Sequence, residues 1–199
     1  MKVIPSSESV KNRIEASLLR IINNCGEHLK KQIVSLPIIV TDDKKAEEIY
    51  SDNFNLFKKA YSEGFGGVKG NITYNGNKYH LIVLNISNIE KLHLTDQELD
   101  GVFSHELGHI FNENPKREMP SILKGNTMNE IDNAKTILLK EAEVYADFFS
   151  KLTLTSDGLI SSIDKYLASG ICLNRDLFTE RVEKLNSDEE FIGSLKFVN

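Results

Sequence analysis

The sequence predicts an α+β protein in which a small, mostly antiparallel sheet with a hairpin packs on one helix and is followed by a C-terminal helical part. Short apolar runs bounded by turn residues lie in the first half of the chain, whereas apolar residues spaced three and four apart dominate the second half. The 199 residues contain no internal repeat or low-complexity linker. A chain of this length suits one domain, so we expect a single domain over residues 1–199.

The first expected element is a helix over residues 8–31, which begins after Ser6 and Ser7. One face of it is apolar, because suitable residues recur every three or four positions: Val10, Ile14, Leu18, Ile21, Cys25 and Leu29. Cys25 is therefore expected to be a buried thiol. The other cysteine, Cys172, is far away in the sequence and no CxxC pair is present, so neither cysteine is expected to bind a metal.

The next segments are expected to build the sheet. Leu36–Thr41 is an apolar run that ends at two aspartates, which is typical of a buried strand. A charged helix is expected over Lys44–Tyr61, followed by a flexible turn over Glu63–Gly70. Asn71–Ile86 contains two strand-forming runs separated by Asn75-Gly76, a dipeptide that is typical of a tight hairpin turn.

The second half of the chain is expected to be helical. Two prolines place a loop over Asn112–Asn126. Apolar periodicity then predicts three helices, over Glu130–Leu152, Asp157–Leu167 and Arg175–Leu185. We expect the last of them to be amphipathic.

Between the hairpin and that loop lies the segment that indicates function. A helix is predicted to open at Thr95, where the Thr95 hydroxyl and the Glu98 carboxylate can form a capping box. His105 and His109 lie one turn apart on this helix, so both imidazoles can reach one metal ion. Glu106 lies about 100° around the helix from His105, close enough to hold a water molecule without binding the metal. Only about 1% of shuffled sequences would contain this HExxH pattern, so a metal site is favoured over a pair of ordinary core histidines.

Two segments together resemble a known family. The sequences HELGH (His105–His109) and EVYAD (Glu143–Asp147) resemble the HExxH…ExxA[DN] pattern of gluzincin-type zinc peptidases, and they are most similar to the small soluble minigluzincins. Metzincins instead require a histidine six residues after the second one, where this chain has Pro115. The resemblance covers about Thr95–Leu152.

The resemblance implies a zincin-like peptidase fold, one catalytic zinc ion, and a role for each matching residue. His105, His109 and Glu143 would bind Zn²⁺, for which two imidazoles and a carboxylate are suitable ligands. Glu106 would be the general base that accepts a proton from water. Asp147 would orient one of the ligand histidines through its second ring nitrogen.

Helical geometry distinguishes Glu143 from nearby Glu141 as the third ligand. The two are about 200° apart around a helix, so they cannot both face the metal. Ala146 and Asp147 lie on the side of Glu143. An apolar stripe is expected to seat this face against the core: Leu139, Ala142, Ala146 and Phe149.

Peptide hydrolysis also needs a donor for the oxyanion and a surface for the substrate. By chemistry alone, the donor could be any of five residues: Tyr145, Tyr166, His80, Arg117 and Arg181. The hairpin strand before the motif helix could provide an edge for an extended substrate. His80, Ile82 and Leu84 would then share one face of that strand.

The leading hypothesis is a zinc-dependent metalloendopeptidase that acts on an intracellular protein or peptide substrate. The alternative is a zinc-binding, non-catalytic regulatory or interaction module with a gluzincin-like fold, and a third hypothesis is a metal-free helical interaction protein. The presence of Glu106 favours the first, because a structural metal site has no use for a base.

The net charge of −5 without a basic run argues against nucleic-acid binding. No apolar run approaches the roughly 20 residues of a membrane helix, and no signal-type N-terminus is present, so we expect a cytoplasmic protein that does not bind membranes.

Overall fold

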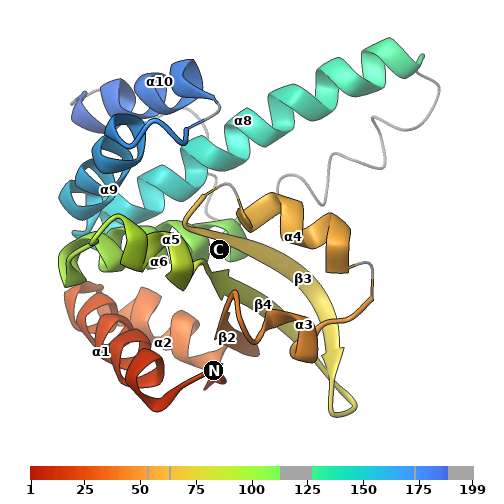
Figure 1. The fold of residues 1–199 in the computed structure, drawn as a ribbon, viewed down its shortest axis with the longest axis vertical. Helices are drawn as coiled ribbons and strands as arrows, with labels where there is room; N and C mark the ends of the chain where they lie inside the picture. The colour runs from red at the N-terminus through yellow and green to blue at the C-terminus, as the bar shows by residue number, and fades with distance from the viewer. Residues whose placement is uncertain (53, 63, 113–126, 173, 188–199) are drawn as a thin grey trace.

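The structure, a computed structural model, describes residues 1–199 apart from 53, 63, 113–126, 173 and 188–199 (Figure 1). It is a mixed α/β fold with a four-stranded open sheet in the order β1-β2-β4-β3. The strands are β1 (Lys2–Val3), β2 (Ile38–Asp42), β3 (Gly66–Tyr74) and β4 (Asn77–Leu84). β1 and β2 are parallel, as are β2 and β4, and only β3 and β4 are antiparallel. The prediction of a mostly antiparallel sheet was therefore wrong, because β2 pairs in parallel with the hairpin and β1 adds a further parallel strand.

The predicted hairpin is present and its turn lies at the predicted dipeptide. Asn75 and Gly76 have φ angles of 48° and 77°, as a tight turn with two left-handed residues requires. β3 begins at Gly66, so the prediction of a flexible turn up to Gly70 was wrong. The glycines there are held in place by pairing with β4, in which Gly66 is opposite Leu84.

Both helices predicted before the hairpin are divided in two. The helix expected over residues 8–31 is α1 (Glu8–Asn24) and α2 (Glu27–Ser35), because Cys25 and Gly26 adopt extended backbone with ψ angles of 150° and 151°. The helix expected over Lys44–Tyr61 is α3 (Ala46–Ile49) and α4 (Phe54–Ser62), with Tyr50 extended after the first. Cys25 is only partly buried, whereas Cys172 is buried.

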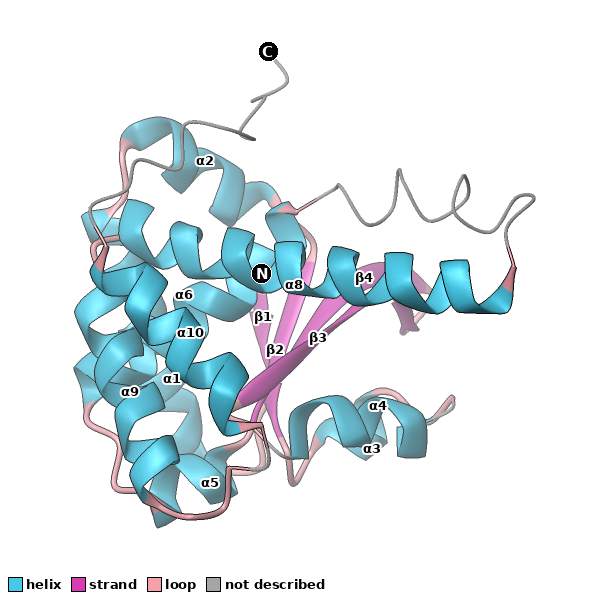
Figure 2. Cartoon of the chain, turned by 90° about the horizontal axis from the view of Figure 1, so that it is seen from above, coloured by secondary structure: helices cyan, strands magenta, loops and turns pink. Residues whose placement is uncertain are grey.

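Helices cover both faces of the sheet (Figure 2). On one face, Ile82 and Leu84 of β4 pack against α1, α2 and α6 (Asp96–Phe111). On the other face, Leu81 and Val83 pack against α3 and α4. A short helix, α5 (Ile86–Lys91), joins β4 to α6.

α6 is the central helix of the fold. Its predicted capping box is present, with the Glu98 backbone N–H donating to the Thr95 hydroxyl and the Thr95 backbone N–H donating to the Glu98 carboxylate. Twelve of its sixteen residues are buried, which requires packing partners on all sides. These are the sheet, α1, α8 (Met128–Leu152) and α9 (Ser156–Ala168).

The C-terminal helices follow the prediction closely. α8, α9 and α10 (Arg175–Asn186) have bounds within two residues of those expected. The N-terminal half of α8 projects beyond the rest of the fold (Figure 1). The loop expected over Asn112–Asn126 lies almost entirely outside the described residues. Among the described helices, none is long and apolar enough to cross a membrane, and the cytoplasmic location stays a prediction.

Two glycines let the neighbouring helices approach the backbone of α6. A Cβ atom on Gly101 would lie 2.2 Å from the backbone nitrogen of Leu159 in α9. A Cβ atom on Gly108 would lie 2.7 Å from Cα of Ala146 in α8. Real Cβ atoms do not come this close to other atoms, so both contacts depend on glycine. The second contact brings α8 against the helix that carries the two histidines.

Candidate metal centre

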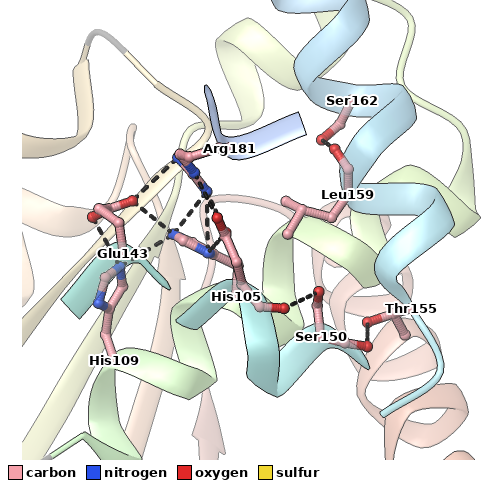
Figure 3. Close-up of polar contacts among 9 residues, drawn as sticks. His105, His109, Glu143, Ser150, Thr155, Leu159, Ser162 and Arg181 are labelled. Carbon is pink, nitrogen blue, oxygen red and sulfur yellow. Dashed lines mark hydrogen bonds and ion pairs between the residues drawn. The ribbon is translucent and has the colours of Figure 1, made fainter. Parts of the chain in front are cut away.

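Three predicted ligand residues converge at the contact between α6 and α8 (Figure 3). Nε2 of His105 lies 3.1 Å from Nε2 of His109. The Glu143 oxygens lie 3.3 Å from Nε2 of His105 and 3.4 Å from Nε2 of His109. Around a tetrahedral zinc ion with ligands at about 2.0–2.1 Å, ligand atoms are about 3.3–3.4 Å apart. Within the described part of the chain, these residues form the one cluster of three His, Cys, Asp or Glu side chains close enough to hold an ion.

Asp147 fixes which nitrogen of His105 faces this point. Its Oδ1 lies 2.8 Å from Nδ1 of His105, so Nδ1 donates a proton to the carboxylate and Nε2 is left facing Glu143 and His109. Lone pairs of two imidazoles and one carboxylate then converge within 3.4 Å. Such an arrangement is stable only with a cation or a proton between the acceptors.

The pKa values reflect this convergence. Burial lowers the pKa of His105 and nearby Arg181 adds to this effect, but hydrogen bonds to Asp147 and Glu143 outweigh both and raise it to about 9. Burial raises the pKa of the Glu143 carboxyl, yet the charge of Arg181 and hydrogen bonds from the two histidines bring it well below its ordinary value. In metal-free protein the site therefore holds an ionised Glu143 beside an easily protonated imidazole.

Arg181 of α10 is the fixed cation of the site. Its side chain is 8% exposed, and its Nε and Nη2 donate to the two Asp147 oxygens at 2.9 and 2.6 Å. Nη1 lies 3.1 Å from Oε2 of Glu143. Burial raises the pKa of the Asp147 carboxyl, but the charge of Arg181 lowers it, and the net shift is downward. Nη2 also lies 3.2 Å from Nδ1 of His105, so Arg181 orients the site, and its role as an oxyanion donor stays a prediction.

Glu106 follows His105 on α6 and lines the same cavity as the three ligand residues. It is 5% exposed, and its Oε2 makes no hydrogen bond with any described residue. Its carboxylate packs against β3, where a Cβ atom on Gly66 would lie 2.7 Å from Oε1. Burial raises the pKa of this carboxyl, and the nearby histidines offset only part of the effect. A buried carboxylate oxygen without a partner is available to hold a water molecule.

The charges of the site match a divalent cation. Glu106, Glu143 and Asp147 carry three negative charges when ionised, and Arg181 carries one positive charge. The remaining two negative charges would be balanced by one Zn²⁺ ion held by His105, His109 and Glu143. The donor set, its spacing and its charge therefore fit zinc.

An open cavity of about 930 Å³ gives access to this centre. His105, Glu106, His109 and Glu143 line it, together with β3 and parts of α8, α9 and α10. Of the predicted oxyanion donors, His80, Tyr166 and Arg181 line the same cavity. Tyr145 does not line it, and Arg117 lies outside the described residues.

Two details of the sequence prediction are corrected by the structure. Glu141 is exposed and Glu143 faces the histidines, as expected. In the apolar stripe of α8, however, Leu139 is 68% exposed and lines the cavity, whereas Ala142, Ala146 and Phe149 are buried. The strand expected to offer an edge is β4, which lies between β2 and β3, so the free edge of the hairpin belongs to β3. His80, Ile82 and Leu84 occupy alternate positions of β4 and so share one of its faces.

The sequence did not predict the role of Arg181 or the contact between Gly66 and Glu106. A signal for the first was present, since Arg181 and Leu185 are the two buried residues of α10 and lie four residues apart. An arginine on the same helix face as a buried leucine is itself expected to be buried, and a buried arginine is normally paired with a carboxylate. No local pattern pointed to Gly66, because its contact depends on how β3 packs over α6.

Comparisons with protein-family models, curated proteins and solved structures find no match to this chain. The resemblance to gluzincins therefore stays a prediction that rests on the HELGH and EVYAD segments. The zincin-like domain and the zinc ion stay predictions as well.

Proposed function

We propose that the protein is a zinc-dependent metalloendopeptidase that hydrolyses peptide bonds of a protein or peptide substrate. The observation that carries this proposal is a base beside a metal-ligand set in an open cavity. Glu106 has a buried oxygen without a partner among the described residues, and it lines the same cavity as the three ligand residues. A site that only held a metal for stability would gain nothing from this third carboxylate, because burying it is costly.

The chain supplies the acid–base chemistry. Zinc, when bound by His105, His109 and Glu143, would make water more acidic and polarise the scissile carbonyl. Glu106 accepts the proton of the attacking water and then delivers it to the leaving amine. Burial raises the pKa of Glu106, which favours the carboxyl group holding the proton between the two steps.

The surrounding residues position the reacting groups. Asp147 holds His105 in the tautomer that leaves Nε2 free, and Arg181 holds Asp147. The edge of β3 offers unpaired backbone groups on which an extended peptide can add as a strand. His80, Tyr166 and Arg181 line the cavity and are the candidates to donate a hydrogen bond to the oxyanion.

The test compares the wild-type protein with Glu106→Gln after both have been supplied with zinc. Metal content is measured by atomic emission, and cleavage is followed on an unfolded protein mixture. We expect about one zinc ion per chain in both proteins, and a loss of about 10²–10⁴ in turnover in the variant, because a non-ligand base has been removed. Zinc without cleavage in the wild type would favour the non-catalytic zinc module. No uptake of zinc, or equal cleavage by both proteins, would refute the proposal.

A further inference from the structure

Outside the metal centre, charged side chains of three helices line the cavity. Lys59 of α4 and Lys140 of α8 are exposed and line it, and no acidic residue of either helix except Glu143 does so. The acidic lining residues outside the metal centre are Asp176 and Glu180, both on α10. Glu180 already has a partner, since Nζ of Lys184 lies 2.7 Å from its carboxylate.

Lys59 and Lys140 approach the cavity from opposite sides. α4 packs on one face of the sheet, and α8 packs on α6, which covers the other face. Figure 2 shows α4 and α8 on either side of β3. On α8, Lys140 lies three residues before Glu143, so both face the cavity on one side of the helix. A peptide along the edge of β3 would therefore pass between the two helices that carry these lysines (Figure 2).

Neither lysine has a carboxylate within ion-pair distance among the described residues. Several other lysines do have such partners, including Lys45, Lys135 and Lys165. The charge of Lys140 does contribute to lowering the pKa of Glu180, although the hydrogen bond and charge of Lys184 have larger effects. The whole chain carries a net charge of −5, so two unpaired lysines at the cavity are not part of a generally basic surface. They locally offset a charge that would otherwise repel acidic peptides.

From these contacts we propose that the cleft selects peptide substrates with an acidic side chain near the scissile bond, held by Lys59 and Lys140. This inference rests on the proposed peptidase function. β3 passes Glu106 at Gly66 and its regular pairing ends after Lys69, where the strand has a bulge. With about 3.4 Å per residue, this edge serves about four substrate residues. The acidic residue is therefore expected within about four positions of the cleaved bond.

The test uses two fluorogenic peptides of otherwise identical sequence. One carries Asp-Glu and the other Lys-Lys at the same two positions, within about four residues of the scissile bond. We expect the wild-type kcat/KM to favour the acidic peptide about three- to tenfold, because each exposed ion pair contributes modestly. The double variant Lys59→Glu/Lys140→Glu should reverse this order. The control Lys58→Glu/Lys135→Glu changes the same charge on the same two helices but outside the cavity, and it should keep the wild-type preference. The preference should also shrink at high salt.

A binding measurement separates this inference from the proposed function. Fluorescence anisotropy of both labelled peptides is recorded with the zinc-supplied Glu106→Gln variant, with and without the two lysine substitutions. Preferential binding of the acidic peptide that is lost with Lys59→Glu/Lys140→Glu supports the inference, even if the wild type cleaves nothing. Equal affinity for both peptides, or an equal effect of the Lys58→Glu/Lys135→Glu control, overturns it, even if cleavage is observed.

Discussion

Gly108 offers a direct test of how the metal centre is built. A Cβ atom at this position would lie 2.7 Å from Cα of Ala146 and 2.8 Å from Cβ of Phe149. Carbon atoms in contact normally lie about 3.5–4.0 Å apart, so Gly108→Ala requires α6 and α8 to separate by about 1 Å. The substitution changes no side chain that reaches the metal.

The separation would move Glu143 away from His105 and His109. Their ligand atoms lie 3.1–3.4 Å apart, which matches tetrahedral zinc. Zinc–ligand distances tolerate deviations of only about 0.2 Å, so a shift of about 1 Å should weaken zinc binding at least tenfold, or by about 1.4 kcal/mol. The unfolding free energy of the metal-free protein should fall by only about 0–2 kcal/mol. Overpacking costs about 1–3 kcal/mol, but alanine improves helix propensity by about 1 kcal/mol.

The assay is a zinc competition titration against a chromophoric chelator, combined with urea unfolding of the metal-free proteins. Gly26→Ala is the control, because a Cβ atom there would meet nothing within 4 Å. We expect this control to bind zinc like the wild type. If Gly108→Ala also keeps wild-type zinc affinity, the close contact between α6 and α8 does not set the ligand geometry, and the reasoning fails.

Three further predictions follow from single contacts. Glu143→Ala should lose most zinc affinity in the same titration while Glu141→Ala changes little, and the reverse order would refute the assigned register of α8. Arg181→Met should lower the unfolding free energy of metal-free protein by about 3–5 kcal/mol in urea unfolding, because it removes the arginine partner of the buried Asp147 carboxylate. Arg13→Met breaks a pair with Asp96, which is 63% exposed, and should cost about 1 kcal/mol or less. Leu154→Gly should stabilise by about 0.5–1 kcal/mol by the same measurement, because Leu154 is 75% exposed and has a φ angle of 57° that favours glycine, and an unchanged midpoint would contradict this.

The parts of the site that could be predicted are those fixed by helix geometry. The spacing of His105 and His109 places them on one face of any helix, and the capping box at Thr95 marks where that helix begins. The same geometry separates Glu143 from Glu141. These relations hold within one helix and so do not depend on how the chain folds around it.

The parts that could not be predicted depend on pairing between distant segments. Whether β2 runs parallel to β4 is decided by the path of the chain and leaves no local pattern in either strand. The glycines of β3 indicated a turn because glycine is disfavoured in strands, yet Gly66 is required by its contact with Glu106. The break at Gly26 was missed because the apolar spacing continues through it.

Arg181 shows how a charge argument could have gone further than pattern matching. Glu143 and Asp147 lie four residues apart and thus on one helix face, and the apolar stripe of α8 directs that region toward the core. Two carboxylates at such a place need positive charge, and one zinc ion could have balanced both. Adding Glu106 makes three, so a second cation is required for neutrality, and the buried face of α10 supplies it as an arginine. A protein that used its zinc only for stability would reach neutrality without Glu106 and Arg181. The cost of burying these two additional charges is understandable if Glu106 is retained for proton transfer.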